Sequence, residues 1–222
     1  MPDEIVTVTS RAGSALFIIK DPREYIQNIW RKKGKFFEDR VLEYIYWHYK
    51  GRDFIDVGSC MGNHTIFFSL FCEPKCVISV EPTPSSCAHQ REMLKLNKID
   101  RRVILHECAV SDKPGRGSLK PWDLRHPFAS NQLVPGDDVE VTTIDLLLSD
   151  RKNINLMKID VEKGELGVLH GAESTLDRCR PALFLEFRTR GIKASCVEFL
   201  SKFGYKQIGS HFQDSTLAEF TV

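Results

Sequence analysis

The chain has 222 residues, with 31 Lys and Arg against 30 Asp and Glu, and 42% of its residues are hydrophobic. This length fits one large domain, and the near-neutral charge gives no overall attraction to nucleic acid or to an anionic membrane. No apolar run approaches the roughly 20 residues that a membrane helix needs. The first five residues also lack the basic and apolar regions of a signal peptide, so we expect a cytoplasmic protein without membrane contact.

Two short strand-like runs, 5–9 and 15–19, precede two helical stretches within residues 1–50. In the second stretch, 36–49, apolar and aromatic residues recur at helical spacing. We therefore expect a small N-terminal helical cap that belongs to the same domain as residues 51–222.

From residue 53 onward the sequence alternates between strands and helices. Strands are expected at 53–57, 76–81, 103–109, 155–160 and 182–187, and helices at 62–71, 84–97, 165–176 and 193–203. Several strands are continuous apolar runs, which suits strands covered on both faces. The alternation predicts a doubly wound, Rossmann-like α/β fold with a mostly parallel sheet. Residues 205–209 and 217–222 are expected to add an antiparallel hairpin at one edge.

Residues 115–138 interrupt this alternation. The stretch is rich in Pro, Gly and His, and it has about the length of an active-site lid. We expect a lid here, with His126 as a candidate base or substrate contact or, alternatively, as an exposed loop residue without a role.

The seven cysteines indicate reduced thiols. Their number is odd, their spacing is irregular, and no Cys-x-x-Cys pair occurs. Cys72 and Cys76 lack a further His or Cys pair at a distance that would complete a zinc site, so no metal is expected from these residues.

The turn after the strand at 53–57 carries the first chemical signal. A dinucleotide fingerprint needs glycines at 58, 60 and 63, but Cys60 and Asn63 occupy two of these positions. Asp56 would repel a pyrophosphate, whereas it suits a ligand with a positive amino group. Glu81 closes the second strand, where it can accept hydrogen bonds from two ribose hydroxyls. These features predict a site for S-adenosylmethionine, the alternative being a tight turn and a solvated strand end.

Three segments resemble the FkbM family of S-adenosylmethionine-dependent methyltransferases. They are Phe54-Ile55-Asp56-Val57-Gly58-Ser59-Cys60-Met61-Gly62-Asn63; Glu81-Pro82-Thr83-Pro84 with the later Asn97; and Met157-Lys158-Ile159-Asp160-Val161-Glu162-Lys163-Gly164-Glu165 with Leu169-His170-Gly171-Ala172. The chain departs from the family at 59–60, where Ala-Asn is usual, and at Lys163, where Gly is common.

The resemblance implies the cofactor site residue by residue. Asp56, Gly58 and Gly62 would hold the methionine part, Glu81 the ribose, and Cys108 and Ala109 the adenine, while Ser59, Asn63, Pro82 and Asp160 complete the set. Glu38 would help to cover the amino end of the cofactor, with a solvated helical Glu as the alternative. Strand alternation is expected to turn Glu107 away from the adenine.

Carboxylates near the ends of the fourth and fifth strands are the catalytic candidates. Asp160 and Glu162 follow the strand that faces the methyl group in this type of fold, and Glu186 ends the next one beside Arg188. A carboxylate within hydrogen-bond reach of an acceptor hydroxyl can serve as a general base. The alternatives are a helix-terminal role for Glu162 and a divalent cation held by these carboxylates. His64 is expected at the border of the cofactor pocket.

The resemblance implies an O-methyltransferase that acts on a hydroxyl of a small molecule or sugar. A second interpretation is an RNA 2′-O-methyltransferase, because the cluster Arg31-Lys32-Lys33-Lys35 offers phosphate contacts, and Asp160 and Glu186 fit two members of the Lys-Asp-Lys-Glu tetrad of such enzymes. A third is a non-catalytic module that keeps the cofactor pocket.

Overall fold

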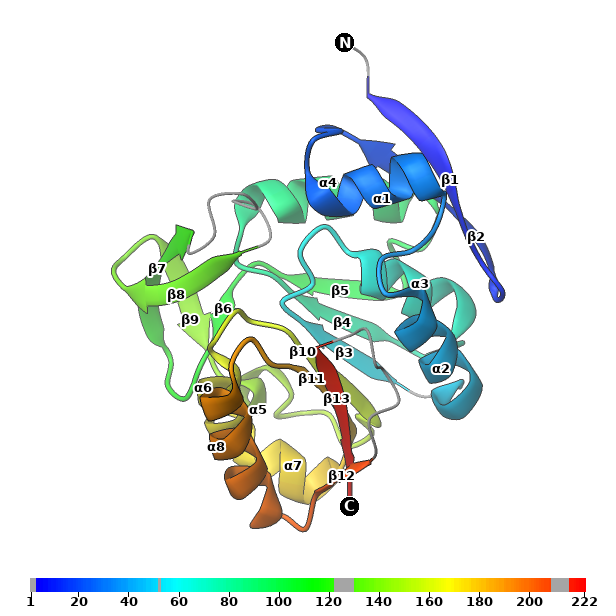
Figure 1. The fold of residues 1–222 in the computed structure, drawn as a ribbon. Coiled ribbons are helices and arrows are strands. Elements are labelled where there is room, and N and C mark those ends of the chain that lie inside the picture. The colour runs from blue at the N-terminus through cyan, green and yellow to red at the C-terminus, as the bar shows by residue number, and fades with distance from the viewer. Residues whose placement is uncertain (1–2, 52, 122–129, 209–215) are drawn as a thin grey trace.

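The computed structural model describes residues 3–51, 53–121, 130–208 and 216–222 (Figure 1). The described residues form a central seven-stranded sheet in the order β12-β13-β11-β10-β3-β4-β5. Its strands are β3 Phe54–Val57, β4 Val77–Val80, β5 Val103–His106, β10 Leu156–Ile159, β11 Ala182–Glu186, β12 Lys206–Ile208 and β13 Leu217–Thr221. Five adjacent strands run parallel, namely β11, β10, β3, β4 and β5. Strand β13 is antiparallel to both β11 and β12. The strand order reverses between β3 and β10, which is where ligands bind in open α/β sheets.

Helices cover both faces of this sheet (Figure 1). One face carries α1 Tyr25–Lys33, α2 Asp39–Tyr49, α3 Asn63–Phe71 and α4 Pro84–Leu96; the other carries α5 Ile144–Leu147, α6 Glu165–His170, α7 Glu173–Cys179 and α8 Arg190–Ser201. Each residue of β3, β4 and β10 is buried, because apolar helices pack on both sides. No helix in the described parts of the chain is long and apolar enough to cross a bilayer.

The N-terminal residues pack on the α3 side of the sheet. β1 Glu4–Ser10 and β2 Gly13–Ile19 form an antiparallel hairpin. The ring of Phe17 lies 4.4 Å from that of Trp30 and 5.3 Å from that of Phe36, and the Phe36 ring lies 5.2 Å from Phe67 of α3. Burying rings of this size contributes a large part of the hydrophobic stabilisation of that face.

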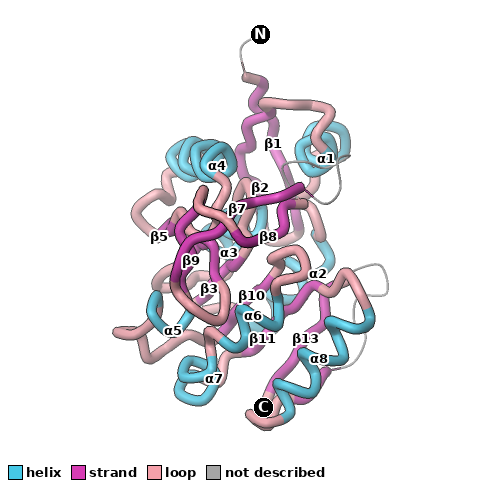
Figure 2. The backbone as a smooth tube through the Cα atoms, turned by 90° about the vertical axis from the view of Figure 1, so that its left-hand side faces the viewer, coloured by secondary structure: helices cyan, strands magenta, loops and turns pink. Residues whose placement is uncertain are grey.

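A second sheet, in the order β6-β9-β7-β8, lies beside the main one between α4 and α6 (Figure 2). Its strands are β6 Ala109–Val110, β7 Gly115–Pro121, β8 Asn131–Pro135 and β9 Val139–Thr142. In the stretch 115–138, where the sequence predicts a lid, the described residues of β7 and β8 pair as an antiparallel hairpin. Gly and Pro within β7 and β8 weaken the strand signal in the sequence. In β9 apolar and polar residues alternate, and this signal could have been recognised.

Two other elements are shorter than expected. The strand at 103–109 is divided, because β5 ends at His106 and β6 joins the second sheet. The helix at 165–176 is divided into α6 and α7 at Gly171, where a Cβ atom would lie 2.1 Å from the carbonyl oxygen of Ser111. That close approach requires glycine, so the interruption follows from packing between chain segments.

Candidate functional site

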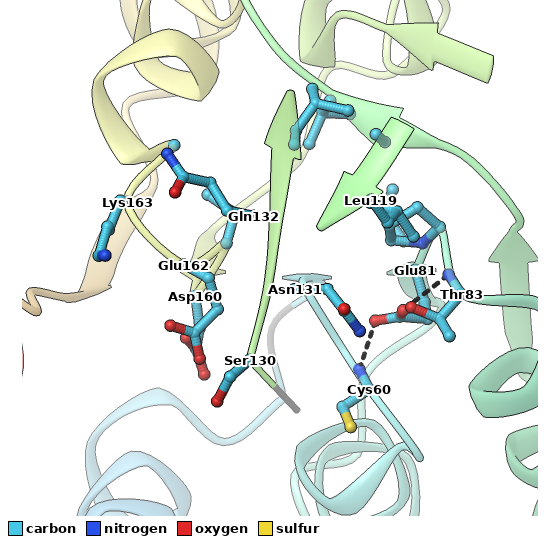
Figure 3. Close-up of a pocket in the computed structure, with 18 of the residues that line it drawn as sticks. Cys60, Glu81, Thr83, Leu119, Ser130, Asn131, Gln132, Asp160, Glu162 and Lys163 are labelled. Carbon is cyan, nitrogen blue, oxygen red and sulfur yellow. Dashed lines mark hydrogen bonds between the residues drawn. The ribbon is translucent and has the colours of Figure 1, made fainter. Parts of the chain in front are cut away.

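A cleft of ≈ 530 Å³ lies at the carboxyl ends of β3, β4, β10 and β11, with β8 along one side (Figure 3). Its volume is in the range of cofactor and ligand sites. Of the residues expected in the site, it is lined by Gly58, Glu81, Pro82, Cys108, Ala109, Asp160, Glu162 and Glu186. Ser59 and Asn63 line a small adjoining hollow together with Gly58 and Asp160.

The glycine turn is in direct contact with the end of β10. Gly58 has φ 75°, and a Cβ atom there would lie 1.8 Å from the carbonyl oxygen of Asp160. Gly62 has φ 88° and precedes α3, and its Cβ would lie 2.7 Å from Cγ of Gln90. Both positions therefore require glycine, the first to bring the turn against Asp160 and the second to pack against α4.

Glu81 lies on the opposite side of the cleft from Asp160 (Figure 3). Its Oε1 accepts the backbone N–H of Thr83 at 2.8 Å, and its Oε2 accepts that of Cys60 at 2.8 Å. Burial raises the pKa of Glu81, while these hydrogen bonds oppose the shift. The carboxylate is thus fixed in orientation, and each oxygen keeps lone-pair capacity for a hydroxyl ligand.

The wall between Glu81 and the second sheet is mostly apolar. Cys108 and Ala109 line the cleft, and Val80, Val110, Leu119 and Leu133 complete this surface. Burial raises the pKa of the Cys108 thiol to about 11, so it contributes as a small neutral group. Glu107 instead forms an ion pair with Arg91, as strand alternation predicts.

Asp56 lies beneath the turn, outside the lining of the cleft. It is fully buried in β3, and its Oδ2 accepts the hydroxyl of Thr65 at 2.6 Å. Ser79, Ser59 and Gln90 continue this hydrogen-bonded network toward α4. The position of Asp56 thus differs from a direct cofactor contact, because a side chain in the middle of a covered strand faces the adjacent packed layer.

Lys158 is a buried cation that connects Asp56 with Asp160. Its Nζ lies 3.5 Å from Oδ1 of Asp56 and 3.3 Å from Oδ2 of Asp160, and its side chain is 3% exposed. Burial opposes its charge, but Asp160 and Asp56 outweigh that effect and raise the pKa of Lys158. Sequence reasoning overlooked this residue, although a lysine within the apolar strand 156–159 was a usable signal.

Asp160 and Glu186 stand side by side at the ends of β10 and β11, and both line the cleft. Burial opposes ionisation of Asp160, but the neighbouring charge of Lys158 outweighs it and lowers the pKa of Asp160 to about 2. Burial and the neighbouring Asp160 charge raise the pKa of Glu186 to about 10. Two neighbouring carboxyl groups oppose each other's ionisation, which is why the charge of Asp160 raises the pKa of Glu186.

Glu162 and Arg188 form a bidentate ion pair on the rim of the cleft. Arg188 Nε donates to Oε2 of Glu162 at 3.1 Å, and Nη2 donates to Oε1 at 2.9 Å. Both Glu162 and Lys163 have positive φ, 54° and 77°, in the turn that follows Asp160. The turn places Glu162 beside Asp160 in the cleft wall (Figure 3).

The hollow beside the glycine turn contains a second set of paired groups. Asn63 accepts N–H groups of Trp30 and Phe37 at 3.0 Å and donates to the carbonyl of Phe37 at 3.0 Å. His64 Nε2 lies 3.2 Å from Oε2 of Glu38, outside the cleft lining. Asn63 therefore ties the N-terminal elements to α3, and His64, which is paired with Glu38, lies in the wall of the hollow.

Two candidates from the sequence remain, the lid residue His126 and a divalent cation held by carboxylates. His126 lies outside the residues that the structure describes. Within those residues, no group of three or more His, Cys, Asp or Glu side chains is arranged to hold a metal ion.

Glu165, the first residue of α6, is a buried acid that was not among the predicted site residues. It is 1% exposed, and its Oε1 accepts the N–H of Lys163 at 3.1 Å. Its Oε2 has no hydrogen-bond partner among the described residues. Burial raises the pKa of Glu165 to about 7, although its backbone hydrogen bonds oppose the shift.

This raised pKa predicts a loss of stability as the pH rises. In the unfolded chain the carboxyl ionises near its ordinary value, so between pH 5 and 8 the folded state binds the proton more tightly than the unfolded state. We expect the free energy of unfolding to fall by about 2–3 kcal/mol over this window through Glu165. Urea denaturation at both pH values should show that Glu165→Gln removes most of the difference. An unchanged difference in the variant would contradict the assignment.

Residues 56–206 match the model of the methyltransferase FkbM domain. The chain belongs to the FkbM methyltransferase family. This match confirms the resemblance seen in the sequence, the Rossmann-like methyltransferase fold, and the assignment to S-adenosylmethionine-dependent methyltransferases. No curated protein sequence matches the chain.

Solved structures share the fold at low identity. The FkbM methyltransferase from Methylobacillus flagellatus KT has 17% identity and a TM-score of 0.57, and the match covers 78% of this chain but only 44% of that one. The M. jannaschii tRNA m1G37 methyltransferase has 9% identity and a TM-score of 0.53, covering 100% of this chain and 55% of that one. M. jannaschii TYW2 in complex with AdoMet has 14% identity and a TM-score of 0.51, covering 100% and 88%.

The cleft of this FkbM chain fits S-adenosylmethionine on its own features. At Gly58 the absence of a side chain lets the turn pack directly against the backbone of Asp160, so both border the cleft. The fixed carboxylate of Glu81 can accept ribose hydroxyls, and the apolar wall from Val80 to Leu133 suits a flat heterocycle. The cofactor supplies an electrophilic methyl group when bound.

Proposed function

We propose that this FkbM protein transfers a methyl group from S-adenosylmethionine to a hydroxyl of a small molecule or sugar. The observation that carries the proposal is the position of Asp160 in the cleft wall, in contact with the glycine turn at Gly58 and 3.3 Å from the ammonium group of Lys158, which lowers the pKa of Asp160. An uncharged hydroxyl is a weak nucleophile, and a carboxylate within reach of its proton assists its attack. Seven cysteines without a disulfide are typical of a reducing compartment, so we also propose a cytoplasmic location.

The residues on the acceptor side suit a neutral, polar acceptor. Ser130, Asn131 and Gln132 line the cleft along β8, and Tyr25 and Phe37 line it from the N-terminal elements. Amide and hydroxyl groups can bind and orient hydroxyls, while the rings provide apolar contact. Holding the acceptor oxygen in line with the methyl group and excluding water can supply about 7–11 kcal/mol of the barrier reduction.

Transfer to RNA receives less support from the charges. Single-stranded nucleic acid binds in grooves lined by cations and aromatic rings. In the proposed basic cluster, Arg31 pairs with Glu4 at 2.6 Å and Lys35 with Asp39 at 3.0 Å. Within the cleft, Arg188 is bound to Glu162 and lies 3.2 Å from Glu186. Arg31, Lys35 and Arg188 are thus each paired with a carboxylate.

The direct test is methyl transfer from isotopically labelled S-adenosylmethionine to parallel pools of hydroxylated metabolites, sugars and RNA. We expect labelled methyl ethers in the first or second pool. Label confined to RNA would overturn the proposal, and Ala substitutions at Lys32 and Lys33 should then flatten the salt dependence of RNA binding. Label on nitrogen or carbon would overturn the assignment of the acceptor atom.

Cofactor binding has its own test at Glu81. Glu81→Gln replaces one accepting oxygen with an NH₂ group that faces a backbone N–H, so the side chain can no longer hold its position. We expect the affinity for S-adenosylhomocysteine to fall by about 10–100-fold, as for the loss of a charge-assisted hydrogen bond. Calorimetry gives the measurement, with Glu107→Gln outside the cleft as the matched control. Equal affinity in the Glu81 variant and the control would rule out the ribose contact.

A further inference from the structure

Lys158 lies in a row of side chains that crosses the sheet on the face covered by α3. Its register partners are Asp56 of β3 and Phe184 of β11, and all three side chains are buried. Two residues earlier on the same face, Leu156 belongs to the apolar cluster that also contains Phe184. Lys158 thus has apolar neighbours on one side and toward the amino end of β10. Its ammonium group is therefore directed toward Asp56 and the carboxyl end of β10.

At that end the ammonium group meets Asp160. Nζ of Lys158 donates a hydrogen bond to Oδ2 of Asp160 at 3.3 Å. Lys158 lines the small hollow beside the glycine turn, and Asp160 lines both this hollow and the cleft. The side chain of Lys158 is 3% exposed and that of Asp160 is 24% exposed. The bond therefore holds the carboxylate from its buried side and leaves lone pairs of Asp160 for a group in the cleft.

Arg188, the other permanent cation of this region, is bound to different carboxylates. It donates two hydrogen bonds to Glu162, and its Nη1 lies 3.2 Å from Oε1 of Glu186. Among the described residues, Lys158 is the cation with which Asp160 forms an ion pair. The orientation of the Asp160 carboxylate therefore depends on Lys158.

We propose that Lys158 is a positioning residue that holds the carboxylate of Asp160 in the orientation from which it accepts the proton of the acceptor hydroxyl. This role rests on the proposed hydroxyl transfer. A displacement of about 1 Å at a reacting group can cost roughly 10²-fold in rate, so a bond that limits the movement of Asp160 contributes to turnover. Asp56, 3.5 Å from Nζ, holds the ammonium group in turn, and the buried contacts run from β3 to the cleft.

A double-mutant cycle on turnover separates positioning from stability. Lys158→Met should lower kcat by at least about tenfold, while the affinity for S-adenosylhomocysteine in calorimetry stays close to that of the wild type. In the Asp160→Asn background the same substitution should cause no further loss, because no carboxylate remains to be oriented. Lys152→Met, at an exposed position, is the matched control. An equal loss in both backgrounds, or an unchanged kcat in Lys158→Met, would overturn the proposal.

Carbon-13 NMR of the aspartate carboxyl groups tests the contact without an acceptor. The resonance of Asp160 is identified by its absence in Asp160→Asn. Between pH 4 and 8 we expect no protonation step for Asp160 in the wild-type protein, because Lys158 lowers its pKa. In Lys158→Met a protonation step should appear in this range, since burial then raises the pKa without an opposing cation. The same titration on Lys158→Met combined with Asp56→Asn replaces the single variant if that variant does not fold.

The other charged groups around this pair remain in every one of these proteins, so they do not account for a difference between them. They are Glu38, His64, Glu162, Glu186 and Arg188. The same titration of Asp160 with and without Lys158 would overturn the proposal. If no acceptor supports turnover, the proposed function fails, while the NMR titration still decides whether Lys158 holds the carboxylate of Asp160.

Discussion

Asp160→Asn is expected to reduce methyl-transfer turnover by roughly 10²–10⁴-fold, the usual contribution of a positioned general base. The substitution keeps the shape of the side chain but removes the oxygen that can accept a proton. The pKa of about 2 does not prevent this role. When the methyl group bonds to the acceptor oxygen before the hydroxyl proton has left, the product is a protonated ether, and a protonated ether is a far stronger acid than Asp160. Proton transfer therefore remains favourable once bond formation to the methyl group is advanced.

The same pKa predicts the pH dependence of the wild-type rate. Since the pKa of Asp160 is lowered to about 2, its carboxylate stays ionised at acidic pH, and we expect no loss of turnover from Asp160 between pH 7 and 5. An unperturbed base such as histidine would produce a decline in that range. A fall in rate with a midpoint near pH 6 would therefore point to another base.

Three measurements on Asp160→Asn separate chemistry from structure. Turnover should fall, while the affinity for S-adenosylhomocysteine and the melting temperature should change little. Asp177→Asn, at an exposed position of α7, controls for a general effect of charge removal. Near-normal turnover would remove Asp160 from the chemistry. A parallel fall of affinity and melting temperature would instead make it a cofactor contact or a structural residue.

The sequence predicted the parts of the site that depend on chain order. Gly58, Glu81 and Asp160 each follow a buried strand of a parallel sheet, so alternation alone brings them to one edge. The wall contributed by β8 was not predicted, because Asn131 and Gln132 reach the cleft through pairing of β8 with β7, and short strands bounded by Gly and Pro have weak local signals.

The sequence also could not show whether a side chain reaches the cleft or is buried beneath it. Asp56 seemed suited to an amino group because it is close to Gly58 in the chain, yet alternation along β3 directs it into the packed layer. Its neighbour there, Lys158, comes from a strand more than 100 residues later, through the register between β3 and β10. Only pairing of the strands identifies this cation as the partner of Asp56.

Lys158→Met is expected to lower the free energy of unfolding by about 3–5 kcal/mol, the usual effect of removing one member of a buried ion pair. Methionine fills a similar volume, so the loss should come mainly from the charges left behind. Asp56 would keep only the hydroxyl of Thr65, and Asp160 would keep Glu186 and Arg188 as neighbours. Urea denaturation at pH 7 gives the measurement, with Lys152→Met at an exposed position as the matched control.

A second substitution identifies the charge responsible. Adding Asp56→Asn to Lys158→Met removes the buried charge that has lost its partner, so the double variant should regain part of the lost stability at pH 7. If the double variant is no more stable than Lys158→Met, the lysine stabilises the protein through packing of its methylene chain, and the ion pair contributes little.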